Sequence, residues 1–415
     1  MTEPGLTQAA AGWSFEEHAT AVLGRLRAAF ADVLDAAPGG RPARASQLAR
    51  AFGLDTKLAW KVTKLVELPD PFEAARYAPG TAGVELFLAA AERGGVPTAR
   101  VKAARDACGE LNELIVLHAG DRKTFEMLLA GYAVREQEKV SLEHRRAAFD
   151  ANTYLFGLQA RSQLKTYLLH PSKDGRHIDL VVIAGFLNLR CIRPNTSWPV
   201  SRLYRLDEAG RVHALPSEPL EESSTPADEL DLPLRRGYSS SPPPAIAPVQ
   251  GPQGVIGHQR VLGGVGRTGA TDFLTGEVVR AAMPARRTAA SRDCAVHTRL
   301  RTPCEGVHLD LFAHRGLFGG RAPEARLYRG MFQGEVLGPL VEEDRLPLSD
   351  PIEPLGSALD DVRLPGLPRY PELLRFACSR TGWDAGAFEG WRVSMRYPPN
   401  PAILTLQQEL LEPSP

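Results

Sequence analysis

Residues 46–65 have the sequence Ser46-Gln-Leu-Ala-Arg-Ala-Phe-Gly-Leu-Asp-Thr-Lys-Leu-Ala-Trp-Lys-Val-Thr-Lys-Leu65 and carry the clearest structural signal in the chain. Glycine adopts the left-handed backbone conformation without strain, so Gly53 can end one helix sharply. Asp55 can then cap a second helix by accepting hydrogen bonds from its free N–H groups. The small side chain of Ala49 lets two helices cross closely. The stretch therefore predicts two short helices joined by a tight turn.

The second of these helices has an apolar side and a cationic side when its residues are spaced at 100°. The apolar side consists of Leu54, Leu58, Val62, Leu65 and Val66. The opposite stripe consists of Lys57, Trp60, Lys61 and Lys64. Positive charge is confined to this region, because residues 41–64 contain six basic residues and one acid, whereas the sign reverses over residues 66–92. Three lysines on one solvent-facing stripe are suited to contact with phosphates.

The stretch resembles the bacterial helix-turn-helix DNA-binding motif over about 20–25 residues. Leu48-Ala49, three further residues, and then Gly53, Leu54 and Asp55 are the matching positions. The resemblance implies that the second helix enters the major groove and that the protein acts as a homodimer on paired half-sites. The DNA-contacting residues that it implies are Arg44, Thr56, Lys57, Trp60, Lys61 and Lys64. Among them, Thr56, Lys57 and Lys61 would lie nearest the bases.

Three features depart from the usual motif. Ala59 is smaller than the Val or Ile common at its position, Leu58 and Trp60 are more apolar than a DNA-facing surface usually is, and no basic β-hairpin follows Leu65. An alternative therefore stays open, in which the helical hairpin makes protein contacts and its lysines are only solvated.

The remainder of the N-terminal third also has helical periodicity. Ser14-Phe-Glu-Glu17 forms a capping box at the start of an amphipathic helix that ends near Gly39-Gly40. Further helices are expected at residues 101–115, 121–132 and about 134–149. We expect a helix-turn-helix domain at residues 1–70 and a helical connector or dimerisation region at residues 71–150.

From about Leu158 the apolar period changes to two, which is typical of strands. The apolar run Leu180 to Leu187 is too short to span a bilayer and predicts a buried strand. Residues 202–215 predict a hairpin that turns at residues 207–210. Residues 370–380 predict a helix, residues 391–397 a strand, and residues 404–411 a last short helix.

Two sequence patterns occur twice, in the same order. Gly175-Arg-His-Ile-Asp-Leu180 is matched by Gly306-Val-His-Leu-Asp-Leu311, and Arg202-Leu-Tyr-Arg205 by Arg326-Leu-Tyr-Arg329. The repetition predicts two related β modules, at residues 151–235 and 285–350. The fold class expected is thus multidomain, α followed by β. Residues 236–284 would form a Pro-, Ser- and Gly-rich connection and residues 351–415 a mixed C-terminal segment, with an exposed linker at residues 216–254.

The repeated pattern contains weak ligand-binding candidates, His177 and Asp179 in the first module and His308 and Asp310 in the second. His314 falls on the same strand face as His308 and Asp310. Cys294, His297 and Cys304 lie nearby in the sequence and suggest zinc. Their spacing matches no common zinc framework, and the first module lacks the cysteines. We therefore expect no metal, and His–Asp pairs that form cross-strand hydrogen bonds.

Gly264-Val-Gly266-Arg-Thr-Gly269 satisfies G-x-G-x-x-G, but no amphipathic helix follows and no acid stands at the required distance. A glycine-rich loop is expected there. The sequence shows no Walker lysine and no nucleophile elbow. We expect neither a cofactor nor enzymatic activity.

Composition excludes two classes of protein. Hydrophobic residues make up 43% of the 415 residues, which excludes wholesale disorder. The 49 basic and 49 acidic residues balance, which excludes a protein that coats nucleic acid or anionic membrane over its whole surface. Five scattered cysteines and an acidic N-terminus predict a cytoplasmic protein with no membrane partner.

The leading hypothesis is a transcription regulator that binds duplex DNA through the 45–66 motif. Its β modules would serve for oligomerisation, for sensing an unknown small-molecule effector, or for both. One alternative is a non-enzymatic interaction or structural protein that uses the helical domain for partner contacts. Another is a metal-dependent enzyme built on His308, Asp310 and His314.

Overall fold

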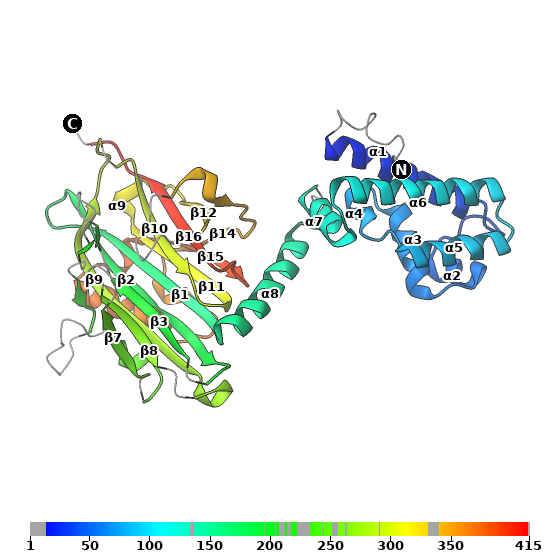
Figure 1. The fold of residues 1–415 in the computed structure, drawn as a ribbon. Coiled ribbons are helices and arrows are strands. Elements are labelled where there is room, and N and C mark those ends of the chain that lie inside the picture. Colours follow the sequence, from blue (N-terminus) through cyan, green and yellow to red (C-terminus); the bar gives the residue numbers. More distant parts are fainter. Residues whose placement is uncertain are drawn as a thin grey trace, which may run out of the picture. The chain divides into compact units, whose positions relative to one another are not determined.

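The computed structural model describes residues 14–132, 137–194, 196–203, 205–206, 212–213, 217–221, 233–242, 244–250, 256–261, 264–289, 291–330 and 340–413. A helical N-terminal region is followed by β-rich sheets, as predicted (Figure 1). The chain divides into two compact units, Met1–Ser141 and Leu142–Pro415.

The helices of the N-terminal part are α1 (Phe15–Asp35), α2 (Ala45–Phe52), α3 (Thr56–Glu67), α4 (Pro71–Ala75), α5 (Thr81–Arg93), α6 (Thr98–His118), α7 (Arg122–Tyr132) and α8 (Gln137–Phe156). The predicted capping box is present, since Ser14 Oγ accepts from the backbone N–H of Glu17 and the Glu17 carboxylate accepts from that of Ser14. One apolar core extends from Ala19 to Leu129. The motif and the helices after it thus form one packed unit, and the boundary at residue 70 stays a prediction.

The C-terminal half of α8, from Leu142, belongs to the second unit and packs within it. Arg145 forms an ion pair with Asp350 at 2.9 Å. The rings of Phe149 and Tyr397 lie 5.3 Å apart, centroid to centroid.

The strands of the second unit are β1 (Leu158–Pro171), β2 (His177–Cys191), β3 (Ser197–Leu203), β4 (Arg205–Leu206), β5 (Val212–His213), β6 (Glu218–Pro219), β7 (Ile246–Gln250), β8 (Ile256–Val261), β9 (Thr271–Pro284), β10 (Asp293–Leu300), β11 (Cys304–His314), β12 (Glu324–Arg329), β13 (Arg345–Leu346), β14 (Ile352–Gly356), β15 (Phe388–Arg396) and β16 (Ala402–Glu409). Two helices accompany them, α9 (Arg315–Phe318) and α10 (Tyr370–Thr381). The main sheet has seven strands in the order β14-β15-β11-β1-β2-β9-β6. A second sheet has the order β10-β16-β12-β13, and a third has the order β3-β8-β7.

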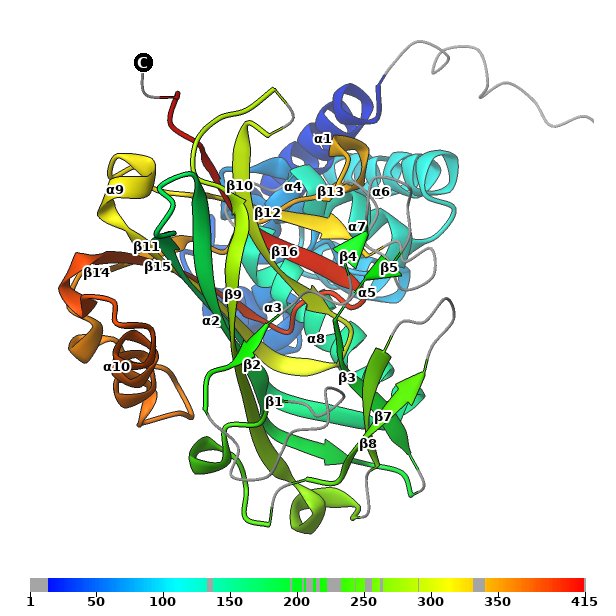
Figure 2. The same cartoon turned by 90° about the vertical axis from the view of Figure 1, so that its left-hand side faces the viewer.

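The seven-stranded sheet is covered on both faces. Leu164 and Leu168 of β1 pack in one core with Leu373 of α10. Tyr167 and Leu169 of β1 belong to the core on the other face, which includes residues of β10 and β16. Figure 2 shows α10 beside β14 and β15, away from β10 and β16. Alternate residues of the central strands therefore meet different layers, because successive side chains of a strand point to opposite faces.

Several predicted elements are confirmed. Residues 180–187 lie in the largely buried strand β2. β4 and β5 pair antiparallel as the predicted hairpin requires, although its turn lies outside the described residues. A 3-10 turn at Gly266–Gly269 is followed by a strand rather than a helix. The repeated blocks occupy β2 and β11, which flank β1 in one sheet, antiparallel and parallel to it respectively. Whether the two modules are related stays a prediction.

Three expectations are wrong. Residues 404–411 do not form a helix, because β16 lies between β10 and β12 and pairs with both. The 216–254 segment is not wholly an exposed linker, because Leu220 and Arg235 are 1% and 3% exposed. The segment expected to be a connection, residues 236–284, also contains β9, a strand of the main sheet. Within the described part of the chain, no helix has the length and apolarity needed to cross a bilayer.

Candidate nucleic-acid interface

The turn between α2 and α3 has the geometry that its sequence predicts. Gly53 is left-handed, with φ 62°, and the N–H of Leu54 donates to the carbonyl of Ala49 at 2.9 Å. Asp55 caps α3, because its Oδ1 accepts from the N–H groups of Lys57 and Leu58 at 2.8 and 3.2 Å. Each half of the turn thus satisfies backbone groups that a helix end leaves free.

The inner side of α3 is fully packed. Its buried residues are Ala59, Val62 and Leu65. Leu58 and Val66 pack at the margin of the same core. This burial fixes the rotation of α3 about its axis and leaves the opposite stripe facing outward.

The C-terminal end of α3 is held by Arg27 of α1. The Arg27 guanidinium donates from Nε to the carbonyl of Leu65 at 3.1 Å and from Nη2 to those of Val66, at 3.4 Å, and Leu68. A cation at a helix C-terminus is also favoured by the helix dipole. Sequence analysis missed Arg27, because its partners stand about 40 residues away and no local pattern connects them.

The cationic stripe is accessible. Lys57 and Trp60 are exposed, whereas Lys61 and Lys64 are half-buried. Among the described residues, no carboxylate lies within 4.0 Å of any of these three ammonium groups. Their charge is therefore not neutralised by an ion pair in that part of the chain.

The other implied contact residues lie close to this stripe in the sequence. Thr56 is the first residue of α3 and is exposed. Arg44 is the N-cap residue of α2 and is also exposed. Arg41 differs from them, because it forms an ion pair with Asp35 at 3.3 Å. The motif thus offers Arg44, Arg50 and the three lysines as accessible cations.

Trp60 is the large apolar residue within the stripe. Its side chain is 43% exposed, and its ring meets the ring of Tyr77 edge-on, with centroids 5.2 Å apart. Tyr77 follows α4, which begins soon after α3 where a winged motif would have a hairpin. Sequence analysis did not identify Tyr77 as the residue that positions Trp60.

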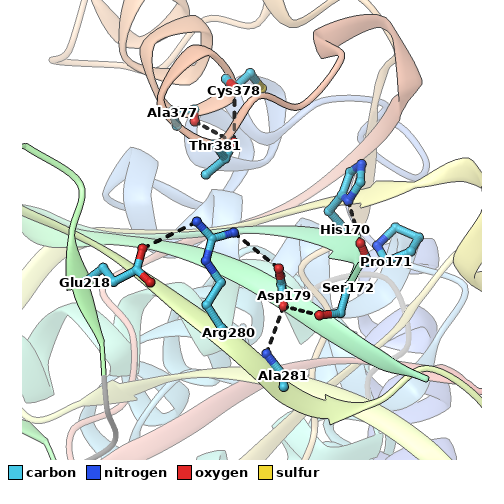
Figure 3. A network of polar contacts seen from close by, with 10 residues as sticks. All are labelled: His170, Pro171, Ser172, Asp179, Glu218, Arg280, Ala281, Ala377, Cys378 and Thr381. Atoms are coloured by element: carbon cyan, nitrogen blue, oxygen red, sulfur yellow. Dashed lines mark hydrogen bonds and ion pairs between the residues drawn. The ribbon is translucent and has the colours of Figure 1, made fainter. Parts of the chain in front are cut away.

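The candidates of the first module serve the fold. Asp179 Oδ1 accepts from Ser172 Oγ at 2.7 Å and from the N–H of Ala281 at 2.8 Å, and its Oδ2 accepts from Arg280 at 3.2 Å (Figure 3). Burial alone would raise the pKa of Asp179, but these three hydrogen bonds lower it. The β2–β9 register shifts beside Asp179. Its carboxylate therefore satisfies backbone and side-chain donors at this irregular point of the sheet. His177 bonds instead to Asp174, at 2.6 Å, within the turn before β2.

The candidates of the second module are enclosed. Asp310 is 0% exposed and accepts from Arg392 Nε and Nη2, at 2.7 and 2.6 Å, and from the Tyr370 hydroxyl at 2.6 Å. His308 Nδ1 lies 2.9 Å from Ser394 Oγ. The contacts with Arg392 and Ser394 cross to β15, whereas the contact with Tyr370 comes from α10. At 0% exposure, this carboxylate is not accessible to a ligand from solvent.

The residues that suggested zinc do not converge. His314 caps α9 by accepting from the N–H of Gly316 at 3.1 Å. The Cys294 thiol contacts Met283, and burial raises its pKa to about 12. Over the described ranges, no three His, Cys, Asp or Glu side chains are grouped closely enough to hold a metal ion.

Comparison with known proteins gives no family. No protein-family model matches the chain, and no curated protein matches it. The functional argument therefore depends on the chemistry of the α2–α3 surface.

Proposed function

We propose that the protein is a DNA-binding transcription regulator that places α3 in the major groove of duplex DNA. The observation that carries this proposal is the stripe of three accessible lysines on the outer side of α3, a helix fixed at both ends by Asp55 and Arg27. A 12-residue helix is about 18 Å long, and the major groove is about 12 Å wide. The N-terminus of α3, with Thr56 and Lys57, would reach base edges.

The lysines and Arg44 would bind phosphates in this arrangement. Such contacts supply affinity and orientation but little sequence discrimination. The homodimer implied by the resemblance would present two copies of α3 to paired half-sites. The β-rich unit would then serve for oligomerisation or for effector binding, without catalysis.

The proposal predicts that removing the lysines weakens DNA binding. The variant Lys57→Ala/Lys61→Ala/Lys64→Ala should bind mixed-sequence duplex DNA on the order of 100-fold more weakly near physiological salt, since three counterion-releasing contacts are lost. Fluorescence anisotropy with a labelled duplex measures this change.

A charge-matched control separates local contact from net charge. Lys102→Ala/Lys123→Ala/Lys173→Ala removes three exposed lysines from α6, from α7 and from the turn after β1. This control should bind DNA nearly as the parent chain does. Equal weakening in both variants, or unchanged binding in the first, would count against the proposed contact.

The exposed Trp60 ring favours a second candidate function, protein contact through the same face. An aromatic side chain that is 43% exposed is a common anchor in protein interfaces. This candidate predicts that Trp60→Ala abolishes capture of a protein partner while the triple lysine variant retains it. A duplex mobility shift that is absent at low salt would favour it over DNA binding.

A further inference from the structure

A cavity of about 410 Å³ lies in the second unit, between the seven-stranded sheet and β10. Residues of β1, β2 and β9 line it from the main sheet, and Pro199 and Val200 of β3 line it as well. Its volume falls within the range of small-molecule sites, about 300–1,000 Å³. The cavity contains charged groups that the fold itself leaves unpaired.

Lys165 of β1 and Glu277 of β9 both line this cavity and are both half-buried. In the described part of the chain, the Lys165 ammonium has no carboxylate within 4.0 Å, and it lies over the Tyr167 ring, 5.4 Å from the ring centroid. Oε2 of Glu277 is buried and has no hydrogen-bond partner there. Burying opposite charges without pairing them is unfavourable, so the site is incomplete as it stands.

Gln163 adds an unused acceptor to the same cavity. Its side chain is 8% exposed, and Nε2 donates to Thr298 Oγ1 at 2.9 Å and to the carbonyl of Arg299 at 2.8 Å. These two bonds fix the amide, and Oε1 is left buried without a donor among the described residues. The cavity therefore contains two buried acceptor atoms without a donor, Oε2 of Glu277 and Oε1 of Gln163, besides the Lys165 ammonium.

The strand register separates the two charges. Glu277 pairs with Val182, which pairs with Tyr167, and Lys165 stands two residues from Tyr167 along β1. Two strand spacings across and two residues along place the Cα atoms of Lys165 and Glu277 about 12 Å apart. Both side chains line the cavity, and this Cα separation is long enough for a small molecule to bridge them.

We propose that this cavity binds a small zwitterion of the amino-acid type. The ligand carboxylate would accept from Lys165, and the ligand ammonium would donate to Glu277, which lies on the side of Lys165 away from Gln163. An apolar side chain would pack against Leu180 and Val279, which also line the cavity. A simple anion would leave Glu277 unpaired and a simple cation would leave Lys165 unpaired, whereas a zwitterion satisfies both.

The neighbouring charges fit this orientation. Burial lowers the pKa of Lys165, Glu277 raises it, and Arg299 lowers it. Arg299 and Arg301 both line the cavity with Lys165. An anionic group beside Lys165 would favour the charged form of this side chain, which burial and Arg299 disfavour. The proposal goes beyond DNA binding, because it gives the β-rich unit a ligand class of its own.

The test is binding of single amino acids to the full chain without DNA. Each of the twenty is screened by the shift that it produces in the melting temperature, and hits are titrated by calorimetry. We expect at least one apolar amino acid to bind. Its N-acetyl derivative, which lacks the ammonium, and its amide, which lacks the carboxylate, should each bind about tenfold more weakly or worse.

Two variants locate the site. Lys165→Met and Glu277→Gln should abolish the response, whereas Lys173→Met, at an exposed position in the turn after β1, should leave it intact. Lys165→Met removes an unpaired charge, so it should melt at the same temperature as the parent chain or higher. The proposal is overturned if no amino acid binds, if both variants retain binding, or if the N-acetyl derivative binds as tightly as the amino acid. A failure of DNA binding would leave the amino-acid result unaffected, and a failure of amino-acid binding would leave the DNA-binding result unaffected.

Discussion

At the scale of single residues, Arg27 shows how a distant side chain supports the candidate interface. Arg27→Ala should lower the free energy of unfolding of the helical unit by about 1–3 kcal/mol, because carbonyls at the end of α3 lose their donor. Chemical denaturation followed by circular dichroism at 222 nm measures the change.

Arg25 provides the matched control for this prediction, because it stands on the same helix. Arg25 pairs with Glu110 at 2.6 Å, and both side chains are more than 40% exposed. Exposed pairs contribute about 0–1 kcal/mol, so Arg25→Ala should change stability little. Equal losses in the two variants would show that Arg27 has no special role at α3.

At the scale of elements, replacing glycine by alanine should have opposite effects on stability in the α2–α3 turn and inside a helix. Neither Gly53 nor Gly109 has atoms within 4 Å of an added Cβ, so only the backbone decides. Gly53→Ala should destabilise by about 1 kcal/mol or more, because Gly53 has φ 62°. Gly109→Ala, inside α6, should stabilise by about 0.5–1 kcal/mol. Melting curves of the two variants that shift in the same direction would contradict this account.

Local and distant interactions also explain which elements could be predicted from the sequence. The α2–α3 turn was predictable because Gly53 and Asp55 act within a few residues of themselves. β16 could not be predicted, because the apolar positions in residues 402–411 suit both a helix and a strand. Only pairing with the distant strands β10 and β12 decides between them. Lys165 could not be predicted as a site residue, because its placement in a cavity depends on β2, β9 and β10, which are distant in the sequence.

At the scale of the whole molecule, acid should destabilise the protein through His297. Burial, with Arg299 and Lys165 nearby, lowers the pKa of His297 from 6.5 to about 3. The unfolded chain therefore binds a proton that the folded chain does not between these values, and stability falls as pH drops through that window. The His297 contribution to the slope is at most about 1.4 kcal/mol per pH unit.

The variant His297→Gln isolates this contribution, because glutamine does not titrate. The difference in unfolding free energy between parent and variant should change steadily between pH 6.5 and pH 4. A difference that is constant with pH would mean that His297 titrates alike in both states.

The central claim is that the ammonium groups of Lys57, Lys61 and Lys64 contact DNA phosphates. The most direct measurement is the slope of log K against log salt concentration for duplex binding, in the parent chain and in the triple alanine variant. The account predicts a slope that is shallower in the variant by about 0.9 for each lost contact. An unchanged slope would contradict it.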